Sequence, residues 1–267
     1  MGSAECSGEM AIDNWAIPSD GIKARRDEVH VWLGSQHHPA ERIASFRRTL
    51  SADEQERAAR FHFERDRVHF IAARGMLRHL LGSFLELSPE KVRFHYSQYG
   101  KPSLSDEYKA SGLEFNISHS SGKVLLAFTV GRAVGVDVEE IRPNFATGEI
   151  AKRFFSVSEV EKLGSLPKGV QAEAFFNCWT RKEAYIKAFG EGLSCPLDKF
   201  DVTLAPGEPS RLLATRVERL SVSRWAMKNL DVGKGYCAAM VVEEDEWQLK
   251  YWRWGSPPSL ANGVSSP

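Results

Sequence analysis

The order of elements in the two halves of the chain constrains the fold more than any other feature of the sequence. Apolar residues at helical spacing predict a long helix over 66–81, and a second long helix is expected over 172–189. Each helix leads through a Leu-Ser link, at 87–88 and at 193–194, into a short strand and then a pair of strands. This repeated order predicts an internal duplication, in which two similar lobes pack against each other.

Shorter patterns complete each lobe. The capping-box pattern from Ser51 to Glu54 predicts a helix that begins near Ala52, and Gly190 is expected to end the second long helix. Alternating apolar residues predict strands, and pairs of strands separated by a polar break predict β-hairpins. The strands are expected at 29–33, 92–96 and 200–204, and the hairpins join 123–130 to 133–138 and 235–242 to 247–252.

The predicted fold class is therefore α+β: two similar lobes, each a small antiparallel sheet with a long helix, packed as an internal pseudo-dimer. The N-terminal lobe is expected over 27–140 and the C-terminal lobe over 141–254. The polar segment 1–26 is expected to be loose, and the tail 255–267, rich in Gly, Ser and Pro, to be disordered. Because the chain contains both halves of the pseudo-dimer, a monomer is expected.

Charge and composition exclude several kinds of partner. The chain has 35 basic and 35 acidic residues, so neither nucleic acid nor a membrane is expected as a partner, and any anion site must be built locally. No apolar run approaches the roughly 20 residues that span a bilayer, and the start of the chain lacks a signal-peptide pattern. The four cysteines are scattered without zinc-ligand spacing, which favours a cytoplasmic protein with free thiols.

Two carboxylates lie at the end of the strand predicted over 133–138. Asp137 and Glu139 project to the same side, because side chains alternate along a strand with period two. Two carboxylates on one face are suited to a hard cation such as Mg²⁺, which takes carboxylate and phosphate oxygens as ligands. The alternative is a solvated strand end whose acids pair with nearby basic residues.

The second long helix carries a charged pair on its flank. Glu183 and Lys187 are four residues apart, beside a buried stripe that includes Phe175, Trp179 and Ile186. The pair is either part of a site or a surface ion pair worth about 0.2–0.5 kcal/mol.

A polar segment, 116–120, is expected at a strand end where the chain turns, followed by Gly122. Its small hydroxyl and amide side chains either bond to the local backbone or bind a phosphate, with His119 adding a donor. Taken alone, Gly100-Lys101-Pro102 is only a turn, and the arginines of the first-half helices are structural or solvated unless a site needs them. These arginines are Arg57, Arg60, Arg74 and Arg78.

In their order along the chain, these segments resemble the phosphopantetheinyl transferases of the Sfp type, the long pseudo-dimeric members of that superfamily. The resemblance runs from about Ser51 to Asp201 and is weaker beyond. It implies transfer of the 4′-phosphopantetheine arm of coenzyme A to a serine of an apo acyl- or peptidyl-carrier protein, with release of 3′,5′-ADP. The matching stretches are 99–102 (Tyr-Gly-Lys-Pro), 115–120, 134–139, 151–155, 176–187 and 190–194.

The resemblance also implies roles for individual residues. Asp137, Glu139 and Glu183 would bind Mg²⁺, with the site in the cleft between the lobes. Glu183, directly or through a metal-bound water, would take the serine proton, and Lys187 would stabilise the leaving charge, so that the catalytic set is Glu183, Lys187 and Asp137. The coenzyme A-binding set is Arg57, Arg74, Lys101, Pro102, Ser118, His119, Lys182 and Lys187, although a structural role for Arg74 at the lobe interface is an equal alternative.

Two other classes of function were weighed. A lipoate or biotin ligase would need a Gly- and Arg-rich adenylate loop, which the sequence does not show. A catalytically inactive coenzyme A-binding or scaffold member of the same fold should have lost Asp137, Glu183 or Lys187, and all are present.

Overall fold

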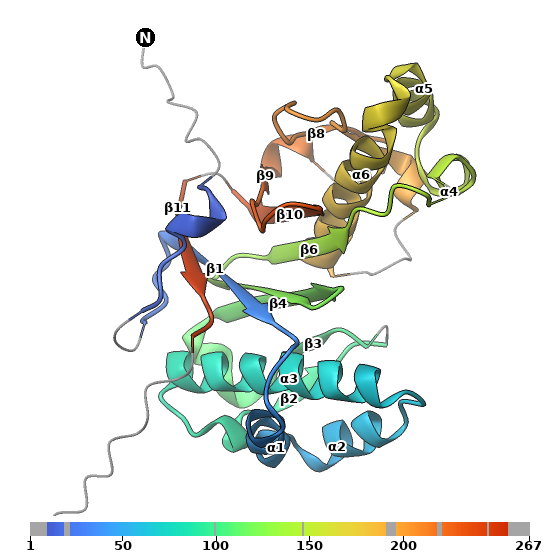
Figure 1. The fold of residues 1–267 in the computed structure, drawn as a ribbon. Helices are drawn as coiled ribbons and strands as arrows, with labels where there is room; N and C mark the ends of the chain where they lie inside the picture. The colour runs from blue at the N-terminus through green and yellow to red at the C-terminus, as the bar shows by residue number, and fades with distance from the viewer. Residues whose placement is uncertain are drawn as a thin grey trace, which may run out of the picture.

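The chain folds as two consecutive repeats of the same element order (Figure 1). The computed structural model describes residues 10–18, 22–98, 100–145, 147–190, 196–217, 221–244 and 246–255. The first repeat contains β1 (Glu28–Ser35), α1 (Ala40–Thr49), α2 (Ala52–Ala59), α3 (Glu64–Leu85), β2 (Phe94–Tyr96), β3 (Pro102–Leu104), β4 (Leu113–Ser120) and β5 (Lys123–Val130). The second contains β6 (Val134–Glu140), α4 (Thr147–Phe154), α5 (Val157–Ser165), α6 (Lys168–Phe189), β7 (Phe200–Val202), β8 (Leu212–Thr215), β9 (Trp225–Asn229) and β10 (Tyr236–Glu243), and β11 (Gln248–Arg253) follows.

Strand pairing repeats with the element order. In each repeat the first strand pairs antiparallel with the last, β1 with β5 and β6 with β10, and the strand before the last completes the sheet. The strands β2 and β3, and likewise β7 and β8, form two-stranded ribbons. One strand breaks the symmetry, because β11 returns to the first sheet and pairs parallel with β1. The duplication and the α+β class are therefore confirmed, and the first sheet is mixed rather than purely antiparallel.

Both predicted hairpins are wrong. The strands β5 and β6 follow each other along the chain but lie in different sheets, and so do β10 and β11. Each of these junctions is a crossing between lobes, which alternation along a strand cannot distinguish from a hairpin turn. By its hydrogen bonds β6 belongs to the second lobe, so the first repeat ends before residue 134 rather than at 140.

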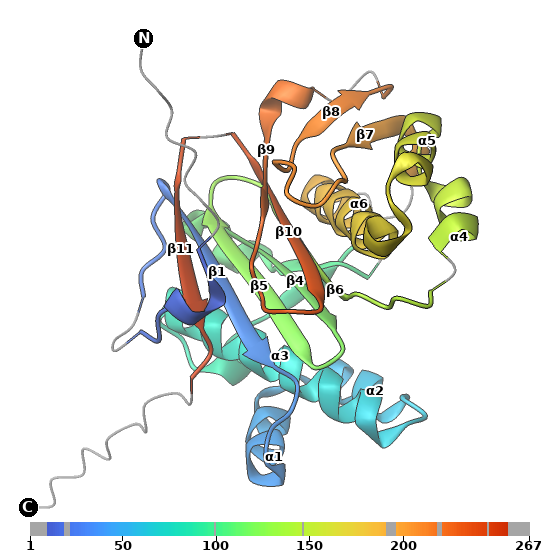
Figure 2. The same ribbon diagram turned by 45° about the horizontal axis from the view of Figure 1, so that its top comes forward.

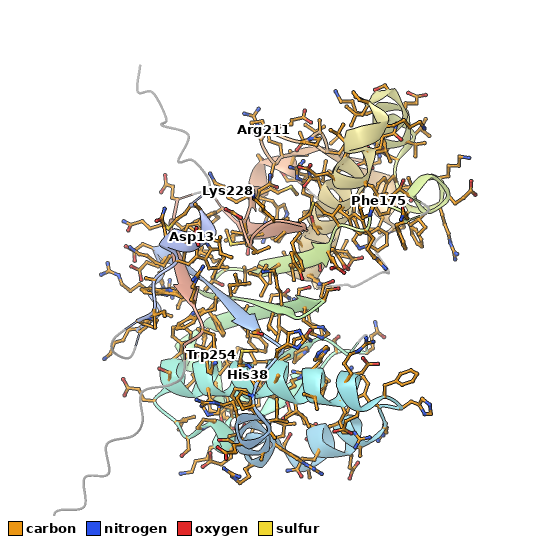
Figure 3. The ribbon with its side chains drawn as sticks, viewed as in Figure 1. Asp13, His38, Phe175, Arg211, Lys228 and Trp254 are labelled. Carbon is orange, nitrogen blue, oxygen red and sulfur yellow. The ribbon has the colours of Figure 1, made fainter. Side chains whose placement is uncertain are left out.

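The sheets pack face to face with helices outside them (Figures 1 and 2). Their inner faces share one apolar core, in which Val31 and Leu125 of the first sheet meet Val136 and Met240 of the second. The helix α3 covers the outer face of the first sheet, and α6 covers that of the second. Figure 3 labels Trp254, which follows β11, and His38, and both rings pack against Phe46 of α1.

Part of the predicted loose N-terminal segment is ordered instead. Trp15 is 3% exposed and joins the core between the sheets, because its ring packs against Tyr251 of β11. Residues 1–9, 19–21 and 256–267, which hold part of the first expected terminal segment and nearly all of the second, lie outside the described residues. Short 3₁₀ turns cover Ile12–Asn14, Pro89–Lys91, Asp106–Ser111, Leu197–Lys199 and Val222–Arg224. Among the described helices, none combines the length and apolar content of a membrane span.

A buried ion pair is duplicated with the fold. In the first lobe, Arg78 of α3 donates from Nε to Glu54 at 2.6 Å and from Nη1 to the carbonyl oxygens of Pro89 and Val92 at 3.0 and 2.9 Å. Its guanidinium also lies 5.1 Å from the ring centroid of Phe94. Glu54 is the capping-box glutamate of α2, so the pair ties the long helix to the short one and to the link after it.

The second lobe contains the same arrangement with lysine in place of arginine. Lys182 of α6 lies 2.7 Å from Glu159, the capping-box glutamate of α5, and donates to the carbonyl oxygens of Leu197 and Phe200 at 2.7 and 2.5 Å. Its ammonium lies 4.3 Å from the ring centroid of Phe200. Lys182 is fully buried, and all three partners are protein groups of its own lobe. The prediction that it binds coenzyme A is therefore contradicted.

We expect Lys182→Met to lower the free energy of unfolding by about 3–5 kcal/mol, since it leaves the Glu159 carboxylate buried without its cation. Urea unfolding at neutral pH measures the change. The matched control is Lys199→Met, whose exposed side chain pairs with Asp198 at the surface and should change stability by about 0–1 kcal/mol. A Lys182→Met protein that unfolds at the wild-type urea concentration would contradict the structural role.

Candidate active site

The site lies where β4, β6 and α6 meet, and a glycine brings the last two together. A Cβ atom on Gly135 would clash with the carbonyl oxygen of Ala184 and the amide nitrogen of Ala188. Only glycine therefore permits α6 to lie directly on β6 at this point. Asp137 follows two residues later on the same face of β6, which places it beside the last turn of α6.

Asp137, Lys187 and Ser118 form a hydrogen-bonded group that joins the two lobes. Nζ of Lys187 lies 2.6 Å from Oδ1 of Asp137 and 3.1 Å from Oγ of Ser118. The Ser118 hydroxyl donates to the same Oδ1 atom at 2.7 Å. The Asp137 side chain is buried, whereas that of Lys187 is 27% exposed and can reach a ligand from the solvent side. The other oxygen of Asp137, Oδ2, is buried and has no hydrogen-bond partner among the described residues.

Two further carboxylates lie within electrostatic range of Asp137. Burial raises the pKa of Glu139, the Asp137 charge raises it further, and a hydrogen bond from Ser120 at 2.8 Å opposes both effects. Burial also raises the pKa of Glu183 to about 7; Lys187 opposes this, while Asp137 and Glu139 add to it. A half-buried carboxyl group with a pKa near neutrality is suited to accept a proton.

The donor chemistry of this group fits a hard divalent cation. Among the described residues, no group of three His, Cys, Asp or Glu side chains is arranged to hold an ion. Oδ1 of Asp137 pairs with Lys187 instead. However, the unpartnered Oδ2 of Asp137 is an oxygen ligand without a donor, and the charges of Glu139 and Glu183 repel it. A cation among these carboxylates would relieve both costs.

A line of basic side chains leads away from Lys187 across the first lobe. His119 lies at the end of β4, where desolvation by the surrounding protein lowers its pKa and the charges of Lys187 and Arg74 lower it further. Its imidazole is therefore mostly neutral near pH 7 and can act as a hydrogen-bond donor. Burial likewise lowers the pKa of Arg74, and the Arg57 charge contributes. Each of these basic groups therefore lies within electrostatic range of the next, from α6 to α2.

The far end of this line is a pocket lined by aromatic, basic and acidic side chains. The guanidinium of Arg74 lies 5.6 Å from the ring centroid of Phe70 and 5.7 Å from that of Tyr96, and its Nη1 atom has no hydrogen-bond partner among the described residues. Arg57 is exposed and lies 5.6 Å from the ring centroid of Phe70. The pocket has a volume of about 510 Å³ and is lined by Asp53, Glu56, Arg57, Arg60, Phe61 and Tyr96.

Three other predicted coenzyme A ligands have protein partners. Ser118 is buried against Asp137 rather than facing a phosphate. Lys101 donates to the carbonyl oxygen of Lys187 at 2.5 Å and so caps the C-terminal end of α6 from the other lobe. Pro102 begins β3, where it pairs with Tyr96. Tyr99, which begins the same motif, lies outside the described residues.

Two polar groups near the carboxylates were missed from the sequence. Ser120 holds Glu139, and the Arg142 charge lowers the Glu139 pKa. The role of Ser120 could have been found, because 116, 118 and 120 alternate with the period of a strand, and the segment expected at a strand end does lie at the end of β4. Arg142 follows β6 and belongs to no periodic sequence pattern that would have indicated a role. Its guanidinium lies 4.2 Å from the ring centroid of Phe145.

Comparisons with known proteins agree with the division of the chain into two lobes. Residues 35–131 match the family model described as 4′-phosphopantetheinyl transferase, N-terminal, and residues 133–241 match the 4′-phosphopantetheinyl transferase superfamily. The two matches divide where β6 begins. The chain is 38% identical over 245 residues to the 4′-phosphopantetheinyl transferase HetI of Nostoc sp., covering 92% of this chain and all of that one.

More distant relatives match parts of the chain. The 4′-phosphopantetheinyl transferase Sfp of Bacillus subtilis is 37% identical over 164 residues, which cover 61% of this chain and 69% of Sfp. A holo-(acyl-carrier-protein) synthase from Bacillus anthracis, solved in complex with coenzyme A (3′,5′-ADP), is 20% identical with a TM-score of 0.35, over 42% of this chain and 96% of that one.

Proposed function

Because the chain belongs to the 4′-phosphopantetheinyl transferase superfamily, we propose that it transfers the phosphopantetheine arm of coenzyme A to a serine of an apo carrier protein. The observation that supports this most is the meeting of Asp137, Glu183 and Lys187 from β6 and α6 at the seam between the lobes. An inactive member of the family would be expected to have lost Asp137, Glu183 or Lys187, and all three are present, so the scaffold alternative is not favoured.

The reaction forms a bond from the serine oxygen to the β-phosphorus of coenzyme A. The bond from that phosphorus to the bridging oxygen of the pyrophosphate breaks, and 3′,5′-ADP leaves with the electron pair. Such a transfer asks the protein mainly for positioning and for charge stabilisation. Lys187 is placed to stabilise charge on the phosphates, and Glu183 to take the serine proton.

Mg²⁺ is the cation that we propose for the carboxylates, with Asp137, Glu139 and Glu183 as the residues that would hold it. When bound, it would neutralise negative charge on the pyrophosphate. We expect excess chelator to abolish transfer and added Mg²⁺ or Mn²⁺ to restore it, measured as formation of holo-carrier. Full activity in chelator would contradict the cation site and leave the roles of Glu183 and Lys187 open.

The basic side chains of this line are the basis for an orientation of coenzyme A in the site. Coenzyme A brings about four negative charges near pH 7, divided between its pyrophosphate and its 3′-phosphate. We place the pyrophosphate at Lys187 and the 3′-phosphate toward His119 and Arg57, with the adenosine near the aromatic pocket of Arg57 and Tyr96. Lys187 then pairs with the charge of the pyrophosphate and Arg57 with that of the 3′-phosphate, while His119 donates a hydrogen bond, although the chain has no net charge.

A comparison with dephospho-coenzyme A tests this orientation. We expect Arg57→Ala to weaken coenzyme A binding by about tenfold to a hundredfold, since a charge-assisted hydrogen bond contributes about 1.5–3 kcal/mol. Binding of dephospho-coenzyme A, which lacks the partner phosphate, should change much less. Calorimetric titration of both proteins with both ligands gives the coupling energy. Equal losses for both ligands would remove Arg57 from the 3′-phosphate site, and Arg48→Ala, an exposed arginine of α1, is the control.

The kind of carrier protein and the assembly state are further parts of the proposal. An acyl- or peptidyl-carrier domain is the expected acceptor, and a monomer is supported because one chain supplies both lobes of the site. The described thiols, Cys178 and Cys237, are free and buried, which supports a cytoplasmic location. Incubating purified apo carriers of several kinds with the protein, coenzyme A and Mg²⁺ tests the proposal by mass spectrometry. A Ser→Ala carrier is the control, and failure of every carrier to gain phosphopantetheine would contradict it.

A further inference from the structure

The end of β4 is joined to β6 by side chains instead of a backbone ladder. Oδ1 of Asn116 accepts a hydrogen bond from the amide of Val136 at 3.1 Å. Oγ of Ser118 accepts from the amide of Val138 at 3.4 Å, and Oγ of Ser120 accepts from the amide of Glu140 at 3.4 Å. The three contacts advance by two residues on both strands, so that they form one continuous row.

This row of side chains supplies hydrogen-bond acceptors to the amides along the edge of β6, which would otherwise be unpaired. The strand β6 is the edge strand of its sheet, with β10 on one side only, and β4 is the edge strand of the other sheet. The amides of 136, 138 and 140 alternate with those that face β10, so they point outward from the sheet. Because Asn116 and Ser118 are buried at the seam, amides left there without acceptors would be costly.

The hydroxyl groups of the two serines both accept and donate. A hydroxyl can accept one hydrogen bond while it donates another. Ser118 accepts from β6 and donates to Oδ1 of Asp137 at 2.7 Å, and Ser120 accepts from β6 and donates to Oε2 of Glu139 at 2.8 Å. The contacts that fix the register of β6 against β4 therefore also fix the direction of its carboxylates.

We propose that Asn116, Ser118 and Ser120 form a side-chain ladder that sets the register between the lobes, and that Ser120 is a positioning residue for Glu139 in the transfer reaction. The second part rests on the proposed function, whereas the ladder does not. The register of the lobes matters because Glu183 and Lys187 are carried by α6, on the second lobe, while the cations that face the 3′-phosphate are carried by the first.

Amide hydrogen exchange tests the ladder without any assay of activity. Exchange at Val136, Val138 and Glu140 is followed by NMR in Asn116→Ala, Ser118→Ala and Ser120→Ala. Each variant is expected to speed exchange about tenfold at its own partner amide, as expected for a lost hydrogen bond. The amides of 135, 137 and 139, which face β10, are the internal control and should keep their rates. Unchanged exchange at the partner amides, or equal acceleration at all six, would overturn the ladder.

Steady-state kinetics test the positioning role of Ser120. We expect Ser120→Ala to lower kcat about tenfold with little change in the KM for coenzyme A, and Ser120→Thr, which restores the hydroxyl, to recover most of that loss. The matched control is Ser121→Ala, since the Ser121 hydroxyl donates to the exposed side of Glu140 at 2.8 Å and lies outside the ladder. If Ser120→Ala does not fold, Ser120→Cys takes its place with the same expectation.

The outcomes separate the two proposals. A wild-type kcat in Ser120→Ala would overturn the positioning role, and so would a loss that Ser120→Thr fails to recover. If the wild-type protein transfers nothing to any carrier, the proposed function fails, while the exchange rates still decide whether the ladder exists.

Discussion

Glu183→Gln is expected to lower kcat by about two to four orders of magnitude, the range of a lost general base. Stability should hold or rise slightly, because burial already raises the pKa of Glu183 to about 7 and a neutral amide avoids the cost of that buried charge. Rates of holo-carrier formation and the melting temperature, measured on the same preparation, give both numbers.

A control variant on the same helix is needed to decide the role of Glu183. Glu173→Gln is the matched control, because Glu173 is an exposed carboxylate near the start of the same helix and is not one of the carboxylates proposed for the site. It should keep the wild-type kcat. If Glu183→Gln also keeps it and loses only a few tenths of a kcal/mol of stability, Glu183 and Lys187 are an ordinary i, i+4 ion pair.

Asp137→Asn is expected to lower kcat by at least about a hundredfold, comparable with the loss of a main charge-stabilising group. The amide keeps the shape of the side chain but removes the anion that holds Lys187 at 2.6 Å. It also weakens the candidate cation site, so raising the Mg²⁺ concentration should recover little of the activity. Kinetics over a Mg²⁺ titration measure both effects.

A surface carboxylate of the second lobe provides the control for Asp137. Asp201→Asn removes a charge that pairs with Arg216 at 2.7 Å, outside the group formed by β4, β6 and α6, and should leave kcat unchanged. A folded Asp137→Asn protein with a rate near that of wild type would exclude Asp137 from the reaction, independently of the result for Glu183→Gln.

Much of the site could be predicted because it depends on local periodicity. Asp137 and Glu139 share a face of β6 by the period of a strand, and Glu183 and Lys187 share a flank of α6 by the period of a helix. The family resemblance then predicted that these two elements meet at one site. Neither pattern predicts that Gly135 is the point of closest approach, which only the packing of α6 on β6 shows.

The wrong predictions share a physical cause, because each concerns a partner that is distant in sequence. Alternation identified β5 and β6 as strands, but their partners come from the far end of each repeat. Lys182 precedes Glu183 in the chain, yet one residue of helix turns the side chain by about 100°, which carries it into the core and onto Glu159. Ser118 has a hydroxyl suited to phosphate, and its actual partners lie on another strand.

The duplicated ion pair shows how far the internal symmetry extends. Arg78 and Lys182 occupy equivalent places and bind equivalent partners, Glu54 and Glu159, although their chemistry differs. Symmetry therefore identifies Lys182 as part of the framework. The carboxylates of β6 are not matched in this way, since β1 has apolar or aromatic residues along most of its length.

The most direct test of the central claim measures both products of one reaction. Wild-type protein and Glu183→Gln are incubated at equal concentration with coenzyme A, Mg²⁺ and an apo carrier, and holo-carrier and 3′,5′-ADP are quantified together by mass spectrometry. We predict equal amounts of the two products from the wild type, and almost none from the variant over the same time. Equal yields from both proteins, or release of 3′,5′-ADP without holo-carrier, would contradict transfer at the seam between the lobes.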